Sequence, residues 1–484
     1  MQPVGTAPRA AAVGKAPTGI AGLDEVTGGG LPRDRATLLC GGPGSGKTLL
    51  ATEFLVRGAT EFREPGVIMT FEESVEDLTT DVASLGFDLT ALITQRKIFV
   101  DHVRNRSEIT ETGEYDLEGL FIRLDHAIKT VKAKRVVLDT IEALFAGFSN
   151  LLILRVELAR LFRWLKDRGV TAVITGERGE RTLTRHGLEE YVSDAVIVLD
   201  NRVDDYVSTR RLRIVKYRGS SHGTNEYPFL IGDTGLRVLP ITSLGLQHEA
   251  SLERVSAGVP GLDAMFGGAG FYRGSSVLLS GPAGTGKSSL AAHFVDAACR
   301  RGERCVYFLF EESPSQYMRN MRSIGIDLEV WIRRRALHFR AARPALLGLE
   351  QHLVAMHRQV DQVKPSVVVV DPINDLLSAG TVSAVKATLL RLVDYLKTHH
   401  ITALFSSLTS GDSREQPTDA NISSLMDTWI LLRTVEGKSE RHRDLYVLKS
   451  RGMPHSTDVR PYTITNHGVQ VAGRSRGTAK RQTR

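Results

Sequence analysis

The chain contains little cysteine and no apolar run long enough to span a membrane. Its three cysteines, Cys40, Cys299 and Cys305, form no metal-binding or redox spacing, which argues against a disulfide framework and suits a reducing compartment. No apolar run approaches the roughly 20 residues that cross a bilayer. Residues 1–16 lack the apolar core of a secretory signal. We therefore expect a cytoplasmic protein with a flexible leader and no membrane partner.

Aromatic residues are also scarce, and the excess positive charge is concentrated at one end. Aromatic side chains make up 6% of the chain. The net charge is +7, but residues 474–484 carry five basic side chains and no acidic one, so the remainder has a net charge of +2. Grooves for single-stranded nucleic acid combine basic residues with stacking aromatics, and no stretch here does so. We expect no nucleic-acid partner for the folded body, and a basic disordered tail over residues 472–484.

Two phosphate-binding loops are the most informative positive feature. Lys47 and Lys287 lie 240 residues apart, each at the end of a glycine-rich loop. Each loop follows a short apolar strand and precedes a helix, a context in which backbone N–H groups face a phosphate. We expect the lysines to reach the β- and γ-phosphates, and the hydroxyls of Thr48 and Ser288 to bind Mg²⁺. The candidate nucleotide-binding residues are Gly42, Pro43, Gly44, Ser45, Gly46, Lys47 and Thr48, then Gly281, Pro282, Ala283, Gly284, Thr285, Gly286, Lys287 and Ser288.

The duplication covers nearly the whole chain. Gly-Leu-Asp opens each half, at residues 22–24 and 261–263, and helical and strand patterns then alternate in the same order. Such alternation predicts an α/β fold in which helices flank a mostly parallel sheet. The boundary falls in a polar stretch between the halves, so we expect domains at residues 17–246 and 247–471.

Each half contains a β-branched run that ends in aspartate, Asp139 in the first half and Asp371 in the second. The carboxyl end of a central parallel strand is where an open α/β sheet presents its ligand site. A strand-end aspartate alone is weak evidence, but its place after the loop in both halves favours a function. We expect both to be Walker-B residues that hold the Mg²⁺ shell through water.

The tetrapeptide Phe-Glu-Glu-Ser occurs at residues 71–74 and again at 310–313. Its first glutamate follows the loop lysine by 25 residues in the first half and by 24 in the second. A carboxylate beside the γ-phosphate can deprotonate an attacking water or hydroxyl. Most acidic dipeptides are solvated surface residues, but recurrence of the whole tetrapeptide favours catalysis. The candidate general bases are Glu72, Glu73, Glu311 and Glu312.

Each half closes with a strand pattern, at residues 212–219 and 445–452. A Lys-x-Arg-Gly-x-x-His motif starts inside each pattern, at Lys216 and at Lys449. On a strand, the Lys and Arg positions face the same side, so the two cations point together. A transferred γ-phosphoryl group needs such cations, often from a neighbouring subunit; the alternative is an exposed basic strand edge. The candidates are Lys216, Arg218 and His222, then Lys449, Arg451 and His455.

Together these elements resemble the KaiC family of RecA-like ATPases, over roughly residues 17–471. The most specific pieces are the two Phe-Glu-Glu-Ser tetrapeptides, the two Lys-x-Arg-Gly-x-x-His motifs, Glu-Tyr-Pro-Phe at 226–229 and the segment 418–424. The resemblance implies two tandem RecA-like P-loop domains that bind ATP and Mg²⁺ in a two-tiered homohexamer. It also implies that the Lys, Arg and His groups named above act across the hexamer interface.

The resemblance further implies different activities for the two halves. Where the first half has Glu-Tyr at 190–191, the second has Ser423 and Ser424, and a hydroxyl can accept a phosphoryl group. In KaiC-like proteins this position holds a Ser-Thr pair that is autophosphorylated with ATP from the adjacent subunit. Without the resemblance, the pair is also compatible with a plain turn. We expect an ATPase in the first domain and a serine/threonine autokinase in the second, with Glu311 activating the acceptor, in a hexameric signalling or timing module.

Three departures from the family pattern bear on this expectation. The second acceptor is Ser424 instead of threonine, so an ordered two-site cycle is not implied. Pro372 follows Asp371, whereas Thr140 follows Asp139. The long C-terminal extension that binds KaiA in the clock protein is missing, so we expect no regulation by KaiA; a KaiB-like protein is a candidate partner.

Two other functions share the same core. A RecA/RadA-like DNA-dependent ATPase would show ATP turnover that rises severalfold with single-stranded DNA. A nucleotide-gated regulatory scaffold would bind ATP tightly and form hexamers, with little turnover.

Overall fold

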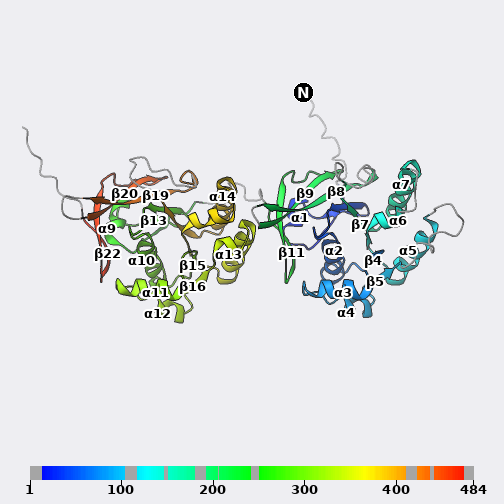
Figure 1. Cartoon of the computed structure of the whole chain (residues 1–484), viewed down its shortest axis with the longest axis horizontal. Helices are drawn as coiled ribbons and strands as arrows, with labels where there is room; N and C mark the ends of the chain where they lie inside the picture. The colour runs from blue at the N-terminus through cyan, green and yellow to red at the C-terminus, as the bar shows by residue number, and fades with distance from the viewer. Residues whose placement is uncertain are drawn as a thin grey trace, which may run out of the picture. The chain divides into compact units, whose positions relative to one another are not determined.

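The computed structural model forms two compact units, Met1–Ser243 and Leu244–Arg484 (Figure 1). It describes residues 13–103, 117–145, 151–179, 192–204, 207–240, 250–409, 422–436 and 441–473. Among these residues, no helix is long and apolar enough to cross a membrane.

The elements of the first unit are β1 Lys15–Ala16, α1 Leu23–Val26, β2 Leu31–Pro32, β3 Ala36–Gly41, α2 Lys47–Glu61, β4 Gly66–Thr70, α3 Val75–Ala83, α4 Leu89–Thr94, β5 Ile98–His102, α5 Glu118–Val131, β6 Arg135–Asp139, α6 Ile141–Phe145, α7 Leu151–Asp167, β7 Thr171–Glu177, β8 Ala195–Asp204, β9 Val207–Tyr217, β10 Glu226–Gly232 and β11 Gly235–Val238.

The elements of the second unit are β12 Arg254–Val255, α9 Pro260–Asp263, η2 Ala264–Phe266, β13 Phe271–Tyr272, β14 Ser276–Gly281, α10 Lys287–Arg300, β15 Cys305–Leu309, α11 Pro314–Ser323, α12 Glu329–Arg333, β16 Leu337–Ala341, η3 Pro344–Leu346, α13 Leu349–Val363, β17 Val367–Asp371, η4 Ile373–Ala379, α14 Val382–Thr398, β18 Thr402–Leu408, β19 Thr428–Glu436, β20 Arg441–Ser450, β21 Arg460–Thr465 and β22 Gly468–Val471.

Within the described ranges, each unit is built around one sheet of nine strands. The order is β11-β10-β9-β8-β3-β7-β6-β4-β5 in the first unit and β16-β15-β17-β18-β14-β19-β20-β21-β22 in the second, which is the same sheet read from opposite edges. The strands from β8 to β5 pair in parallel, as do those from β16 to β19, and the remaining three strands of each unit are antiparallel. The predicted pair of α/β domains with mostly parallel sheets is confirmed.

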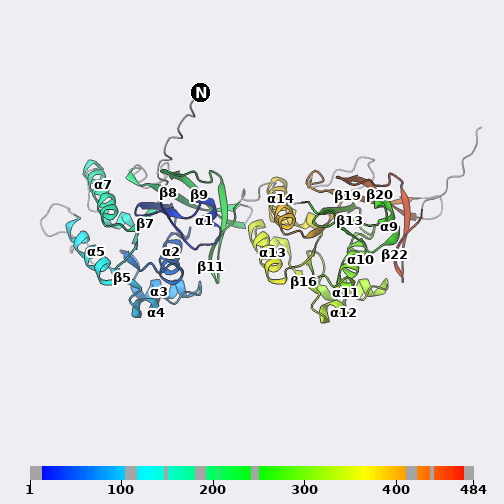
Figure 2. The same ribbon diagram turned by 180° about the vertical axis from the view of Figure 1, so that it is seen from behind.

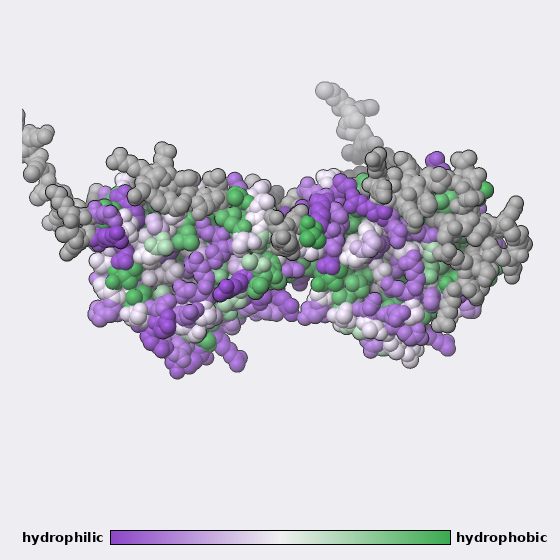
Figure 3. All heavy atoms as spheres, in the orientation of Figure 1, coloured by the Kyte–Doolittle hydropathy of each residue, from purple (hydrophilic) through white to green (hydrophobic). Residues whose placement is uncertain are grey.

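Alternate residues of the central strands face two different hydrophobic cores. In β3, Leu39 packs in the core that includes α2, α3 and α4, whereas Leu38 packs in the core that includes α5 and α7. In β6, Val137 and Val136 divide in the same way. Apolar strands of this kind are typical of a parallel sheet covered on both faces. Figures 1 and 2 show α3 and α4 beside α2, and α11 and α12 beside α10; the visible face over α11 and α12 is mostly hydrophilic (Figure 3).

The closing strands differ from their predicted bounds. The patterns at 212–219 and 445–452 belong to β9 and β20, which begin earlier and end at Tyr217 and Ser450, because a turn follows each strand. Arg218 and Arg451 therefore lie just beyond the strand ends, and each of their backbone N–H groups donates to a carbonyl that precedes the neighbouring strand.

A buried arginine joins distant segments of the first unit. Arg135, at the start of β6, is fully buried. Its guanidinium donates to Glu64 Oε2 at 2.7 Å and to the carbonyl oxygens of Phe54 and Pro17 at 2.8 and 2.7 Å. Because each of its three guanidinium nitrogens donates to a partner in another segment, this side chain holds the start of the domain and α2 against the sheet.

Replacing Arg135 should destabilise the first unit strongly. Arg135→Ala leaves buried acceptors without their partner, so we expect the free energy of unfolding to fall by about 3–5 kcal/mol. Urea unfolding of the full chain, followed by hydrogen exchange of the β6 amides, measures this loss. Arg33→Ala is the matched control, because Arg33 pairs with the same Glu64 at 2.8 Å from a partly exposed position; it should cost less than about 1 kcal/mol. Equal losses in the two variants would contradict this role for Arg135.

Equivalent positions on α2 and α10 hold the last hairpin of each sheet. Glu53 Oε2 accepts a hydrogen bond from Leu236 N at 2.7 Å, and His293 Nε2 accepts one from Val469 N at 2.8 Å. The imidazole must be neutral at Nε2 to accept this bond. Burial lowers the pKa of His293, although Asp296 opposes the shift.

The stability of the second unit should therefore decrease as the solution becomes acidic. His293 binds a proton more readily in the unfolded chain, where its pKa is about 6.5. Its contribution is fully present above that value and is lost as the pH falls through the lower pKa of the folded state. Hydrogen exchange of the β22 amides between pH 7.5 and 5 measures this loss. His293→Gln keeps an acceptor that does not titrate, so its β22 amides should show a smaller change; an identical pH dependence would exclude His293 as the cause.

Candidate nucleotide sites

The two phosphate loops share one backbone conformation. Gly44 and Gly46 in the first loop, and Gly284 and Gly286 in the second, have φ angles between 68° and 94°. Residues with a Cβ rarely adopt this conformation. A Cβ built at Gly42, Gly44 or Gly284 would meet nothing within 4 Å. Open space therefore lies over each loop, where a phosphate chain would bind.

The ammonium group of each loop lysine folds back onto its own loop. Lys47 Nζ donates to two loop carbonyl oxygens at 2.8 and 3.1 Å, and Lys287 Nζ does so at 2.8 and 2.9 Å. Lys287 is 7% exposed, and burial lowers its pKa to about 8, although Asp371 and Glu311 oppose the shift. A bound phosphate would give these ammonium groups a charged partner in place of the carbonyls.

In the first unit, the Walker-B candidate contacts the phosphate loop directly. Asp139 ends β6 and is 4% exposed. Its Oδ2 accepts a hydrogen bond from Thr48 Oγ1 at 2.8 Å, and its Oδ1 accepts one from Thr175 Oγ1. The hydroxyl and the carboxylate that the sequence predicts near Mg²⁺ are thus brought together.

In the second unit, the equivalent carboxylate has other partners. Asp371 ends β17 and is 6% exposed; Ser406 Oγ donates to its Oδ1, and Tyr307 Oη donates to its Oδ2 at 2.7 Å. Within the described part of the chain, the Ser288 hydroxyl makes no hydrogen bond to Asp371. Tyr307, which the sequence analysis did not single out, takes the place that Thr48 has in the first unit.

Both sites offer the oxygen ligands that Mg²⁺ prefers. Each has one strand-end carboxylate and one loop hydroxyl, and Mg²⁺ in nucleotide enzymes is usually bound by one or two carboxylates together with substrate phosphates. Among the residues described, no group of three His, Cys, Asp or Glu side chains could hold a metal ion by itself. The side chains fit a cation that arrives with phosphates.

The glutamates of the first unit differ from one another. Glu72 Oε1 accepts a hydrogen bond from Thr140 Oγ1 at 3.3 Å. Glu73 is half-buried, and its Oε2 has no hydrogen-bond partner among the described residues. Burial raises the pKa of Glu73, and nearby carboxylates, first of all Asp139, raise it further. A carboxylate with a raised pKa and a buried oxygen that has no hydrogen-bond partner is suited to accept a proton.

In the second unit, the first glutamate of the tetrapeptide, Glu311, interacts electrostatically with Lys287 of the phosphate loop. Partial burial raises the pKa of Glu311, Asp375 and Asp371 raise it further, and Lys287 opposes them. Glu312, which precedes α11, instead accepts a hydrogen bond at its Oε2 from Nδ2 of Asn320 in that helix, at 3.0 Å. Pro372 has no hydroxyl, so Glu311 lacks the contact that Thr140 gives to Glu72.

The serine of each tetrapeptide has a structural role that the sequence analysis missed. Ser74 and Ser313 are the N-caps of α3 and α11: Ser74 Oγ accepts from Asp77 N at 3.1 Å, and Ser313 Oγ accepts from Gln316 N at 3.3 Å. A serine followed three residues later by an acidic or amide side chain is a helix-start signal that could have identified them. These caps fix where the chain turns after the two glutamates.

The candidate cations lie near the amino ends of the parallel strands, whereas the phosphate loops follow the carboxyl ends. The first loop begins at the carboxyl end of β3, which runs parallel to β8. Lys216 pairs with Val196 at the amino end of β8, and Arg218 N donates to the carbonyl of Asp194 just before this strand. At about 3.3 Å per residue, this arrangement separates the backbone of the loop from that of the cations by roughly 15–20 Å.

In the second unit, the serine pair lies beside the cations. Lys449 Nζ donates to the carbonyl oxygen of Ser423 at 2.9 Å, and Arg451 Nη2 donates to that of Ser424 at 2.8 Å. Ser423 is half-buried and Ser424 is exposed. Both precede β19, which runs parallel to β14. The serine pair and the cations thus lie at one edge of the sheet, and the phosphate loop lies at the other.

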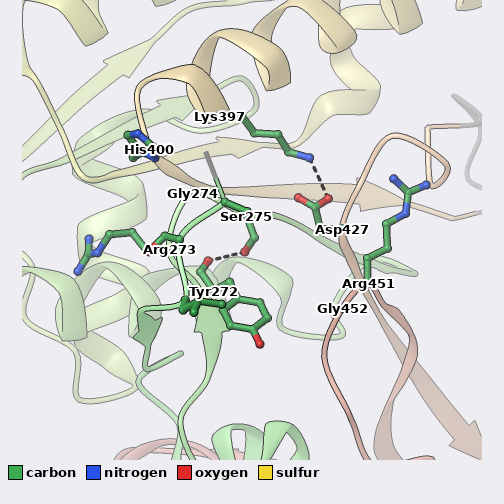
Figure 4. Close-up of a pocket in the computed structure, with 12 residues that line it drawn as sticks. Tyr272, Arg273, Gly274, Ser275, Lys397, His400, Asp427, Arg451 and Gly452 are labelled. Carbon is green, nitrogen blue, oxygen red and sulfur yellow. Dashed lines mark hydrogen bonds and ion pairs between the residues drawn. The ribbon is translucent and has the colours of Figure 1, made fainter. Parts of the chain in front are cut away.

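A cavity of about 320 Å³ opens at this amino-terminal edge of the second unit (Figure 4). Lys397 Nζ contacts Asp427 Oδ1 at 2.8 Å, and Asp427 Oδ2 accepts from Ser276 N at 2.8 Å. Although burial opposes the shift, these contacts lower the pKa of Asp427. Arg451 lines the same cavity. The ion pair therefore fixes the residue just before β19, next to the serine turn at 423–425.

The two histidines of the closing motifs lie in the loops after the strands. His222 Nδ1 lies 2.9 Å from the carbonyl oxygen of Gly223, and His455 Nδ1 lies 3.2 Å from that of Met453. The Glu-Tyr pair at 190–191, the first part of the predicted leader (1–12) and residues 474–484 of the predicted tail are outside the described residues.

Comparison with known proteins identifies close relatives along nearly the whole chain. The family model described as "ATPase: KaiC" matches residues 16–243 and again 255–476. The circadian clock protein KaiC2 of Synechocystis sp. is 55% identical over 461 residues, which cover 94% of this chain and 81% of that protein. The circadian clock oscillator protein KaiC of Prochlorococcus marinus is 38% identical over 95% of this chain and 93% of its own length, and that of Synechococcus elongatus is 38% identical over 95% and 89%.

Nucleotide affinity at the second site should fall above pH 8. With a pKa of about 8, Lys287 is uncharged at higher pH in the empty site and must take up a proton to bind a phosphate. We expect the affinity for ATP to fall by up to about tenfold per pH unit between 8 and 9.5. Titration of a fluorescent ATP analogue in a Lys47→Ala background, in which only the second loop keeps its lysine, measures this.

Lys287→Arg is the control, because a guanidinium stays charged across this range. Its binding should depend little on pH. A wild-type second site whose affinity is constant from pH 7 to 9.5 would show that Lys287 keeps its proton.

Proposed function

This chain belongs to the KaiC family of ATPases, and we propose that it is an ATP-driven hexameric signalling or timing module. In this proposal, residues 17–246 hydrolyse ATP, and residues 247–471 transfer the γ-phosphoryl group to Ser423 or Ser424. Relatives named as circadian clock proteins support the timing role. The three cysteines are buried and none of them forms a disulfide, which agrees with a reducing cytoplasm.

The separation between each cradle and the cations of its own domain carries the proposal. The central strand places the loop and the Lys-x-Arg pair at opposite edges of the same sheet. A second copy that presents its cation edge to the loop would bring Lys216 and Arg218, or Lys449 and Arg451, to the γ-phosphate. In a closed ring every such edge meets the next loop, so no site is left incomplete.

In the first domain, we assign the role of general base to Glu73. Its buried oxygen without a hydrogen-bond partner, half-buried position and raised pKa suit it to take a proton from an attacking water. Glu72, held by Thr140, would lie beside it. Lys47 would bind the phosphates, while Thr48 and Asp139 would hold Mg²⁺, which neutralises charge on the phosphate oxygens when bound. The water oxygen bonds to the γ-phosphorus as the bond to the β-phosphate oxygen breaks.

In the second domain, we assign the role of base to Glu311, which is coupled to Lys287 and Asp371. The acceptor would come from an adjacent copy, because the serine pair lies at the far edge of its own sheet. The serine oxygen forms the new bond to the γ-phosphorus, the bond to the β-phosphate oxygen breaks, and the hydroxyl proton passes to Glu311. Ser424, the more exposed of the two serines, is the more accessible acceptor.

Mixing two inactive variants tests both the acceptor and the transfer between copies. Lys287→Ala chains keep the serines but lose the loop lysine, whereas Ser423→Ala/Ser424→Ala chains keep the loop but lose the acceptor. With γ-labelled ATP, neither variant alone should be labelled at residues 423–424. After mixing and reassembly, phosphosite mass spectrometry should find label on the Lys287→Ala chains.

The outcomes of this experiment separate the parts of the proposal. Full labelling of the Ser423→Ala/Ser424→Ala variant alone would refute the acceptor. Mixed hexamers, verified by native mass spectrometry with Mg·ATP, that stay unlabelled would refute transfer between copies. Ser323→Ala, which removes an exposed hydroxyl at the end of α11, serves as the control and should be labelled like the wild type.

A further inference from the structure

Two buried tyrosines form a hydrogen-bond chain that ends at the second Walker-B carboxylate. Tyr307 lies on β15 and Tyr317 on α11, and their exposed fractions are 0% and 1%. Tyr317 Oη donates to Tyr307 Oη at 2.8 Å, and Tyr307 Oη donates to Asp371 Oδ2 at 2.7 Å. The two rings lie 4.8 Å apart, and both contact the ring of Phe339. The chain thus joins α11, the helix that follows the glutamate pair, to the carboxylate.

Among its described residues, the first unit has no counterpart of this hydrogen-bonded tyrosine pair. Gly66 of β4 pairs with Arg135 as Cys305 of β15 pairs with Val367, so the position of Tyr307 is that of Ile68. Tyr317 lies four residues after its N-cap serine, where the first unit has Leu78. Ile68 and Leu78 are buried in the hydrophobic core and offer no hydroxyl. The tyrosines therefore mark a difference between two otherwise matching sites.

The difference changes which group orients the carboxylate. In the first unit, the loop hydroxyl of Thr48 donates to Asp139, so the loop itself orients the aspartate. In the second unit, Tyr307 orients Asp371, and the hydroxyl of Ser288 is not used for this purpose within the described residues.

We propose that Tyr307, supported by Tyr317, is a positioning residue that fixes Asp371 before nucleotide and the divalent cation bind at the second site. The inference rests on the proposed nucleotide site and adds how its cation shell is prepared. A carboxylate that is already oriented loses little freedom when a hydrated cation binds beside it. Ser288 can then contact the cation without first giving up a hydrogen bond to Asp371.

The support from Tyr317 follows from its two acceptors. Its hydroxyl lies 2.8 Å from Tyr307 Oη and 3.0 Å from the carbonyl oxygen of Ser288, the loop residue that would bind the cation. Tyr317 therefore contacts both the tyrosine that holds Asp371 and the backbone of the loop. Its single hydroxyl proton serves one of these acceptors at a time. Loss of this hydroxyl weakens the placement of Tyr307 but leaves its bond to Asp371 in place.

The Mg²⁺ dependence of nucleotide binding tests this role without relying on activity. The full chain in a Lys47→Ala background is titrated with a fluorescent, non-hydrolysable ATP analogue at increasing Mg²⁺ concentrations. Loss of one net hydrogen bond to a charged group corresponds to a change of roughly tenfold in an equilibrium constant. We therefore expect Tyr307→Phe to raise the Mg²⁺ concentration at half-maximal binding by about tenfold, and Tyr317→Phe to raise it by a smaller factor.

Controls separate this role from folding and from the proposed function. Tyr272→Phe removes the hydroxyl of a tyrosine that does not belong to the hydrogen-bonded pair. It should leave the Mg²⁺ concentration at half-maximal binding unchanged. If Tyr307→Phe does not fold, the shift in Tyr317→Phe still decides the question. Midpoints in the phenylalanine variants that equal or fall below that of the parent overturn the positioning role alone. A parent chain that binds the analogue without any dependence on Mg²⁺ would instead refute the cation site on which the inference rests.

Discussion

The length of one central strand separates each phosphate cradle from the cations of its own domain. Parallel strands β3 and β14 place both loops at their carboxyl ends, and antiparallel strands β9 and β20 return Lys216 and Lys449 to the opposite edge. Since a side chain cannot bridge roughly 15–20 Å, strand direction alone would keep a single domain from completing the proposed site. In the proposed ring, assembly is therefore part of the catalytic site.

The features that the sequence predicted are those in which local order determines position. Strand, loop and helix are contiguous around Lys47 and Lys287, so the cradles form where the motifs stand. Asp139 and Asp371 end apolar runs, and parallel pairing then brings such ends to one edge. The closing strands end two residues before their predicted limit, because an alternating pattern does not show where a turn begins.

Contacts between distant segments could not be predicted in this way. The two tetrapeptides are identical, yet Thr140 holds the first glutamate in one domain and Asn320 holds the second in the other. Arg135 is a basic residue at the start of a strand, which usually indicates an exposed side chain, but its partners come from three separate segments. Tyr307 lies in an apolar run and is typical of a core residue until its bond to Asp371 is seen.

The two domains keep the same motifs and differ in the hydrogen-bond partners of those motifs. In the proposed sites, a change of the loop lysine or the strand-end aspartate would remove a phosphate or cation contact, whereas the groups that orient them can change. Replacing Ile68 by tyrosine at the matching position, and Thr140 by proline, alters the carboxylate and the glutamate pair while the cradle backbone stays the same. A duplicated domain can therefore acquire a different reaction through neighbouring side chains, and such neighbours are where a division of labour between hydrolysis and phosphoryl transfer should be sought.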